Sequence, residues 1–403
     1  MRKILLFFAL ALLVAASCRK TESNVLNDDD ALLYLLQTER VLDTRPFGYK
    51  TELPAYLRAV GMENPQIDDD KVALGRALFY DKQLSRDGSV SCASCHRQNR
   101  AFSDNVAFSP GIDGQPGHRN AMPLANVSNF ASHYSSIAGK HPLLLWDERA
   151  TTVEEQARIA ITNPMEMGMD MPGLVRRLNA LDYYPYLVKR AFGDLQFTET
   201  RILEGLAAFV GAMGGLDSKF DKSMIQTSGQ MTGSLDTIVT AVYYGSSNDT
   251  TVVFSLPFFS VSEFQGLRLF VDNCSKCHSP IRPLQEVFVA CNGLDMDYAD
   301  AGLGALTGRS TDAGVFKSPS LRNIALTAPY MHDGRFKTLP EVVEFYSTGV
   351  NDHPNLHPDM PRAADGSPRP NWTAQEKANL VAFLNTLTDA TITADPRFSS
   401  PFK

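Results

Sequence analysis

Four of the six cysteines stand in two copies of one pattern, in which two thiols three positions apart are followed directly by a histidine. The copies are Cys92-Ala-Ser-Cys95-His96 and Cys274-Ser-Lys-Cys277-His278. This spacing attaches haem c covalently, because each thiol adds across a haem vinyl group and the histidine reaches the iron. We therefore predict two haems, with His96 and His278 as axial ligands. Zinc is not expected, because the two Cys pairs of a zinc site usually lie close together in the chain.

Other segments repeat around the two motifs. Gly75-Arg-Ala-Leu-Phe79 precedes the first motif and Gly266-Leu-Arg-Leu-Phe270 precedes the second. Downstream, Asp147-Glu-Arg-Ala-Thr-Thr-Val-Glu-Glu155 has a counterpart in Asp333-Gly-Arg-Phe-Lys-Thr-Leu-Pro-Glu341, at nearly the offset of the motifs. In both, a threonine followed three residues later by a glutamate predicts a capped helix start. We predict a mainly α protein with two duplicated cytochrome c-like haem domains and extended loops.

The N-terminus has the features of a processing signal. Arg2 and Lys3 precede a short apolar run, Ile4–Val14, and small residues then lead to Cys18. This resembles a bacterial lipoprotein signal with Cys18 as the lipidated residue; an ordinary signal peptide is the alternative. The apolar run is short for a transmembrane helix. Either interpretation predicts export to the periplasm, and the first adds a lipid anchor to a bacterial membrane.

The domain organisation follows from these assignments. The net charge of −7, without a basic run, argues against nucleic acid as a partner. Cys291 belongs to neither motif, and we expect it to be a buried or loop thiol without a role. The predicted divisions are a signal peptide at 1–17, a tether at 18–52, an N-terminal cytochrome c-like domain at 53–222, an insertion or linker at 223–260 and a C-terminal cytochrome c-like domain at 261–390.

Each haem iron takes one axial ligand from its motif, so the opposite axial position decides the chemistry. An occupied position suits electron transfer, whereas an open one admits a small molecule such as peroxide. Two haems in one chain therefore suggest a division of labour, in which one haem receives electrons and the other reacts.

Several further segments, together with the two motifs, resemble the bacterial di-haem cytochrome c peroxidase and MauG superfamily. The resemblance runs from about Leu53 to Leu387 and follows the family's order of motifs. The segments that carry it are Leu74-Gly-Arg-Ala-Leu-Phe-Tyr-Asp81, Ser85-Arg-Asp-Gly88, Trp146-Asp-Glu-Arg149, Glu155-Gln-Ala157, Asn163-Pro-Met-Glu-Met-Gly168, Ser320-Leu-Arg-Asn-Ile324 and Ala328-Pro-Tyr-Met-His-Asp-Gly-Arg335.

The resemblance implies that the N-terminal haem reacts with peroxide and that the C-terminal haem supplies electrons. By motif position, Glu166 is the distal acid–base glutamate, Gln156 the distal glutamine and Trp146 the tryptophan between the haems. A carboxylate in an apolar pocket can move the proton that splitting of the O–O bond requires. The alternatives are a solvated loop carboxylate, a surface glutamine and a tryptophan that only packs.

The resemblance also implies a calcium ion between the domains, at positions that match Asn120, Thr327 and Pro329. Oxygen ligands of this kind suit a hard cation. Family members are often dimers, so a homodimer is a further expectation.

The chain departs from the family's peroxidases at the second haem. They place a methionine ligand about fourteen residues after the His-Asp-Gly histidine, where this chain has Tyr346, which resembles MauG. A phenolate ligand lowers the iron's potential, whereas methionine raises it. Tyr346 as a plain core aromatic is the alternative. The rival ligands, with Met360 ranked first, are Met331, Met360, His353 and His357.

A second departure concerns the gating histidine that many of these peroxidases carry in a loop of the first domain. The matching region contains only His118, which lies too close to Asn120 to occupy that position. We therefore predict that the first haem has no distal protein ligand.

Three functions fit these residues. The first is a di-haem peroxidase that reduces hydrogen peroxide to water with electrons from a small cytochrome c, a cupredoxin or a quinol-linked donor. The second is a MauG-like oxidase that uses peroxide to oxidise a protein or organic substrate through a bis-ferryl state. The third, a plain electron carrier, predicts two six-coordinate low-spin haems.

Overall fold

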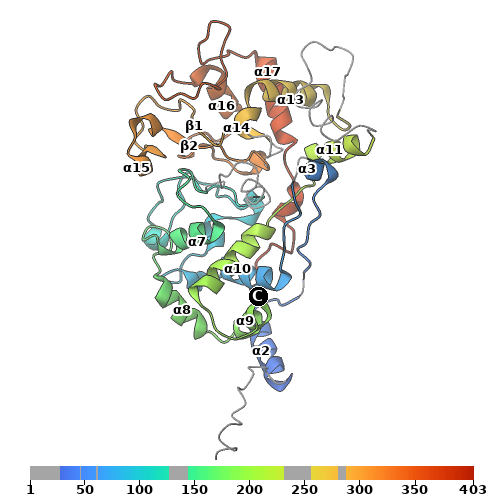
Figure 1. The fold of residues 1–403 in the computed structure, drawn as a ribbon, viewed down its shortest axis with the longest axis vertical. Helices are drawn as coiled ribbons and strands as arrows, with labels where there is room; N and C mark the ends of the chain where they lie inside the picture. Colours follow the sequence, from blue (N-terminus) through green and yellow to red (C-terminus); the bar gives the residue numbers. More distant parts are fainter. Residues whose placement is uncertain (1–27, 46, 60–61, 127–143, 231–255, 280–286) are drawn as a thin grey trace, which may run out of the picture.

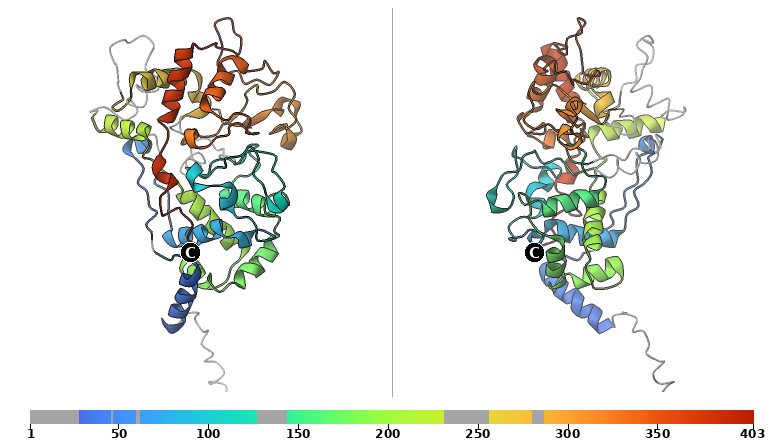
Figure 2. Two further views of the ribbon diagram at one scale, coloured as in Figure 1. Left: turned by 180° about the vertical axis from the view of Figure 1, so that it is seen from behind. Right: turned by 60° about the vertical axis from the view of Figure 1, so that its left-hand side comes forward.

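The computed structural model describes residues 28–45, 47–59, 62–126, 144–230, 256–279 and 287–403. The predicted signal peptide with Cys18 and most of the predicted insertion lie outside these residues. The described chain is mainly helical, and its sheet has two strands. The helices gather into two halves stacked along the long axis of the molecule (Figure 1, Figure 2). Within the described ranges, no helix is long and apolar enough to cross a membrane.

The first half is built around the packing of α4 (Asp69–Tyr80) on α10 (Glu199–Ala212). Asp68 caps α4 by accepting hydrogen bonds from the backbone of Asp70 and Lys71. Gly75 allows the close approach of the two helices, because a Cβ there would lie 1.8 Å from the Gly205 carbonyl oxygen. The other helices of this half are α5 (Cys92–Cys95), α7 (Val153–Thr162), α8 (Met171–Asn179) and α9 (Pro185–Phe192).

The second half repeats this arrangement with α13 (Val261–Asn273) and α17 (Ala374–Asn385). Here Gly266 takes the place of Gly75, since a Cβ on it would lie 1.9 Å from the Asn379 carbonyl oxygen. Thr373 caps α17, since its side chain accepts the backbone N–H of Glu376. The remaining elements are α14 (Ser275–His278), β1 (Val289–Cys291), α15 (Gly304–Thr307), the antiparallel partner β2 (Val315–Lys317), α16 (Leu339–Glu344) and a π-helical turn at Phe345–Gly349.

The duplication extends to backbone hydrogen bonds. In the first half, Asn126 donates its N–H to Met213 and accepts a hydrogen bond from Gly215 at Oδ1. In the second half, Asn323 bonds to Leu387 and Asp389 in the same way. Both asparagines have a positive φ, 64° and 62°. Each one therefore fixes the chain after the last helix of its domain, α10 or α17.

Several segments pack with the half of the molecule that does not contain their neighbours in the sequence. The short helix α3 (Ala55–Ala59) and α11 (Lys219–Gln230) lie beside the second half (Figure 1), and Leu53, Tyr56 and Phe220 pack in its core. In the opposite direction, Phe398 of the C-terminal tail packs in the first core. Residues on either side of the predicted division at 53 thus contribute to different cores, since Tyr49 belongs to the first. The helix α2 (Asp28–Val41) projects from the first half (Figure 1).

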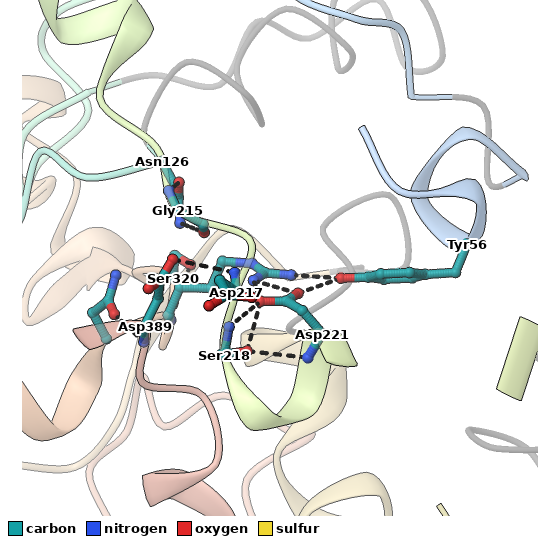
Figure 3. A network of polar contacts seen from close by, with 10 residues as sticks. Tyr56, Asn126, Gly215, Asp217, Ser218, Asp221, Ser320 and Asp389 are labelled. Carbon is teal, nitrogen blue, oxygen red and sulfur yellow. Dashed lines mark hydrogen bonds and ion pairs between the residues drawn. The ribbon is translucent and has the colours of Figure 1, made fainter. Parts of the chain in front are cut away.

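A buried polar network joins these crossing segments (Figure 3). Arg322 of the second half donates to both carboxylate oxygens of Asp221 in α11, at 2.9 and 3.1 Å. Tyr56 also donates to Asp221, and Ser218 completes the set with its hydroxyl and backbone N–H. The side chains of Arg322 and Asp221 are 2% and 0% exposed, so this ion pair is fully desolvated. Burial of this kind requires every charge to be matched.

Candidate active site

The first motif lies on α5, in a half-buried position. The His96 imidazole contacts the Phe102 carbonyl oxygen through Nδ1 at 2.8 Å, which leaves Nε2 to face an iron. Burial lowers the pKa of His96, so its neutral, ligating form is favoured. Burial also raises the pKa of the thiols, to about 12 for Cys92 and about 11 for Cys95. Neither thiol forms a disulfide.

The second motif has the same construction. His278 contacts the Pro319 carbonyl oxygen through Nδ1 at 3.0 Å, and burial raises the pKa of Cys274 to about 12. The motif lines a mostly apolar cavity walled by Phe270, Leu380 and other core residues of the second half. Two oriented imidazoles, thiols outside disulfides and an apolar cavity fit haem c at the predicted positions.

Glu166 lies within electrostatic range of the first motif. The charge of its carboxylate adds to the rise in the pKa of both Cys92 and Cys95, after burial as the main cause. A tight loop holds it there, in which the Asn163 side-chain amide donates to Glu166 Oε1 at 2.7 Å. Gly168, with φ of 59°, closes the loop. Burial raises the pKa of Glu166 above its ordinary value.

Gln156 lies on α7, whose N-cap is Thr152, as the sequence predicts. Its Oε1 is buried and accepts no hydrogen bond from any described residue. A buried amide oxygen that accepts no hydrogen bond lowers the stability of the fold. Such an oxygen suits a side chain that binds a small polar molecule.

Trp146 lies where the two halves meet. Its indole N–H donates to the Asn120 carbonyl oxygen at 2.8 Å, and its own carbonyl accepts from the backbone of Lys317 on β2 at 2.8 Å. The ring lines the second cavity together with Cys274 and His278. The tryptophan of the first half thus forms part of the wall of the second site.

Tyr346 lines the same cavity, in the π-helical turn that follows α16. Such turns concentrate at functional sites. Burial raises the pKa of its phenol to about 12, and the motif thiols Cys274 and Cys277 add to this rise. The Asn292 amide donates to Tyr346 Oη at 3.4 Å and to Met331 Sδ at 3.8 Å, while its Oδ1 accepts from the Leu294 backbone. Asn292 therefore stands between two candidate sixth ligands.

The rival ligands separate into two pairs. Met331 and Met360 line the cavity, whereas His353 and His357 are not among its lining residues. His353 Nδ1 accepts from the backbone of Asn355, and His357 Nδ1 accepts from that of Asp359. The Nδ1 atom of each histidine is thus held by a backbone N–H two residues further along its own loop.

The positions assigned to calcium come together. Asn120, Thr327 and Pro329 all line the second cavity, beside Trp146. The Asn120 amide nitrogen donates to the carbonyls of Val106 and Ala107, at 3.0 and 3.3 Å, which turns Oδ1 away from them. His118, the histidine expected not to gate the first haem, is exposed at the surface.

Asn292 is the residue that the sequence did not single out. An asparagine in a loop after a cysteine carries no pattern that points to a haem cavity. Its place depends on the pairing of β1 with β2, in which Ala290 lies opposite Phe316. Only the folded chain brings it to Tyr346.

Comparison with known proteins adds to this geometry. The family model for di-haem cytochrome c peroxidases matches residues 69–229. MauG of Methylorubrum extorquens is 32% identical over 330 residues, which are 80% of this chain and 79% of that protein. The cytochrome c551 peroxidase of Nitrosomonas europaea is 30% identical, over 72% of this chain and 75% of its own length.

Solved structures agree with the sequence comparisons. A MauG-like protein associated with microbial copper homeostasis shares the fold with a TM-score of 0.59 and 30% identity, over 83% of this chain and 94% of that one. The di-haem peroxidase BthA of Burkholderia thailandensis has a TM-score of 0.57 at 23% identity, which supports the fold alone. With its predicted motifs and these relatives together, the chain belongs to the di-haem cytochrome c peroxidase family, whose members are peroxidase-type oxidoreductases with two haem c groups and include proteins named MauG.

Proposed function

We propose that this chain reduces hydrogen peroxide at its first haem and receives the electrons through its second. The observation that carries the proposal is Glu166, a half-buried carboxylate with a raised pKa within electrostatic range of Cys92 and Cys95. Gln156, whose buried Oε1 accepts no hydrogen bond from the described residues, supports it as a second polar group for the pocket. His118 is exposed, in keeping with a first haem that has no distal protein ligand.

A haem at this site would supply the iron to which peroxide binds and the electrons that cleave it. Glu166 takes a proton from the oxygen of peroxide nearer the iron and returns it to the leaving oxygen, which departs as water. The Asn163 amide fixes one carboxylate oxygen during this transfer. Because burial raises its pKa, Glu166 is a better proton acceptor than an exposed glutamate.

The route for electrons between the halves runs through Trp146. Its ring lines the second cavity, while its chain belongs to the first half. The indole N–H is held by a backbone carbonyl, which keeps the ring in one orientation. A small cytochrome c, a cupredoxin or a quinol-linked protein is the proposed donor, in the periplasm, with a lipid on Cys18 as the anchor. A calcium ion held by Asn120, Thr327 and Pro329 would stiffen the junction beside Trp146.

Tyr346 favours a second candidate function. A phenolate on the second iron lowers its potential and favours higher oxidation states, as an oxidase of the MauG kind requires. The chain would then use peroxide to oxidise a protein or organic substrate. Mixing the diferric protein with peroxide in the absence of a donor distinguishes the two. A long-lived oxidised spectrum on both haems supports the oxidase, and rapid return to the ferric state supports the peroxidase.

The acid–base role is tested with Glu166→Gln. We expect peroxide turnover to fall by about 10²- to 10⁴-fold, with both haems still attached. The wild-type rate should also fall as the pH drops through the raised pKa of Glu166, because only the carboxylate accepts the proton, and this dependence should vanish in the variant. Glu154→Gln, in the first turn of α7, is the control. Unchanged turnover in Glu166→Gln would rule out the role.

A further inference from the structure

Cys291, which belongs to neither haem motif, is part of a compact cluster in the second half. The thiol is 1% exposed, and its Sγ lies 3.6 Å from Tyr298 Oη and 3.6 Å from His353 Nδ1. The Tyr298 and His353 rings contact each other edge to face, with centroids 5.4 Å apart. Three oxidisable or titratable side chains, from β1 and two loops, thus share one small volume.

The hydrogen bonds in this cluster have a direction. Tyr298 Oη accepts the backbone N–H of Leu294 at 2.9 Å, so its own proton is available to the sulfur of Cys291. His353 Nδ1 accepts the backbone N–H of Asn355 at 2.9 Å, so this nitrogen carries no proton and faces the thiol as an acceptor. The order of groups is therefore phenol, thiol and imidazole, each directed towards the next.

The cluster lies just behind the wall of the second haem cavity. The Tyr298 ring packs against Phe316, with centroids 6.2 Å apart, and Phe316 lines the cavity. Gly314 makes room for the ring, since a Cβ there would lie 2.3 Å from it. On the other side, Met296 and Asp297 are exposed next to Tyr298 in the chain. Tyr298 is thus one aromatic layer from the cavity and directly next to an exposed residue in the chain.

We propose that Tyr298 is a one-electron relay between the second haem and the protein surface, and that Cys291 and His353 take up its phenolic proton. The inference rests on the proposed function, because the oxidant is the second haem after peroxide has oxidised the protein. Tyr298 gives one electron to that haem. Its O–H proton moves to the sulfur of Cys291 as the thiol proton moves to the lone pair of His353 Nδ1, which gives up the hydrogen bond that it accepts from the Asn355 backbone. The products are a neutral tyrosyl radical, an intact thiol and an imidazolium, and an electron from a donor at the surface reverses every transfer.

The need for a proton acceptor explains why Tyr298 is suited to this step. Burial and the neighbouring Cys291 raise the pKa of its phenol, so the group is neutral before oxidation. Tyr330 provides the contrast. It lines the haem cavity itself, but its hydroxyl donates to the Ile324 backbone carbonyl at 3.0 Å. A carbonyl oxygen accepts a hydrogen bond but does not take the proton, so Tyr330 lacks the path that Tyr298 has.

The test mixes the diferric full-length holoprotein with hydrogen peroxide and records freeze-quench EPR spectra. We expect a tyrosyl radical in the wild type, its loss in Tyr298→Phe and its persistence in the matched control Tyr330→Phe. Cys291→Ala should lower the yield of the radical by at least about tenfold, because the proton then has no acceptor within reach. The optical spectrum of the second haem before peroxide is added should be the same as in the wild type for Tyr298→Phe and Cys291→Ala, whose side chains do not line its cavity.

The outcomes separate the relay from the proposed function. A radical that persists in Tyr298→Phe, that disappears in Tyr330→Phe or that is absent although peroxide oxidises both haems would overturn the relay alone. An optical spectrum that does not change with peroxide would overturn the proposed function, and the relay with it.

Discussion

Among single residues, Asn292 contacts two candidate ligands of the second haem, Tyr346 and Met331. Its Oδ1 is held by the Leu294 backbone, which turns the amide N–H groups towards Tyr346 Oη and Met331 Sδ. A donor that points at a phenolate oxygen withdraws electron density from it. The amide therefore moderates the ligand that Tyr346 would provide, in the way that hydrogen bonds around a haem generally set its potential.

Replacing Asn292 with leucine, which has a similar size and no donor, should lower the midpoint potential of the second haem. The phenolate then gives more of its electron density to the iron. A spectroelectrochemical titration measures both haems at once, and the first haem serves as the internal control. An unchanged potential at the second haem would mean that the amide does not act on the ligand.

At the scale of elements, the paired helices of each half depend on a glycine at their crossing. Gly75 faces Gly205 across α4 and α10, and Gly266 faces Asn379 across α13 and α17. In both, an added Cβ would lie less than 2 Å from a backbone carbonyl oxygen, and backbone gives way less readily than a side chain. The repeated Gly-x-x-Leu-Phe pattern is thus explained by packing.

Gly266→Ala should lower the free energy of unfolding by about 3 kcal/mol or more, the upper part of the range for overpacked cores. Gly48→Ala is the matched control, because an added Cβ there meets no atom within 4 Å. Differential scanning calorimetry compares the two. Equal melting temperatures of the two variants would show that α13 and α17 can move apart to make room for the added Cβ without a loss of stability.

Local patterns predicted many of the elements. The haem motifs and the caps at Thr152 and Thr338 depend on residues close together in the chain, and the duplication is visible as repeated short segments. The π-helical turn at Tyr346 has no such local signal. Cys291 was expected to lack a role, and its neighbours Tyr298 and His353 come from separate loops that meet only after folding.

At the scale of the whole molecule, the two halves are joined by chain segments that exchange cores. Tyr56 and Phe220 pack with the second half, although both lie before the haem motif of that half in the sequence. The buried ion pair between Asp221 and Arg322 holds α11 against the second half. No sequence pattern links two residues so far apart in the chain.

Arg322→Met removes one partner of the buried pair and leaves the Asp221 carboxylate without its cation. We expect a loss of about 3–5 kcal/mol in the free energy of unfolding, measured by urea denaturation. The double variant Arg322→Met/Asp221→Leu should recover most of it, since neither charge then remains buried. A single variant as stable as the wild type would show that the pair does not hold the halves together.

The proposed function requires two different haem irons in one chain. The first would have a free axial position on the side of Glu166, and the axial position of the second would be occupied by Tyr346. An EPR spectrum of the ferric holoprotein, recorded with its optical spectrum, measures this directly. We predict one high-spin, five-coordinate haem and one low-spin haem with the signature of histidine–tyrosinate ligation, which Tyr346→Phe removes. Two low-spin haems, or a second haem with the absorption band of a methionine ligand, would contradict the account.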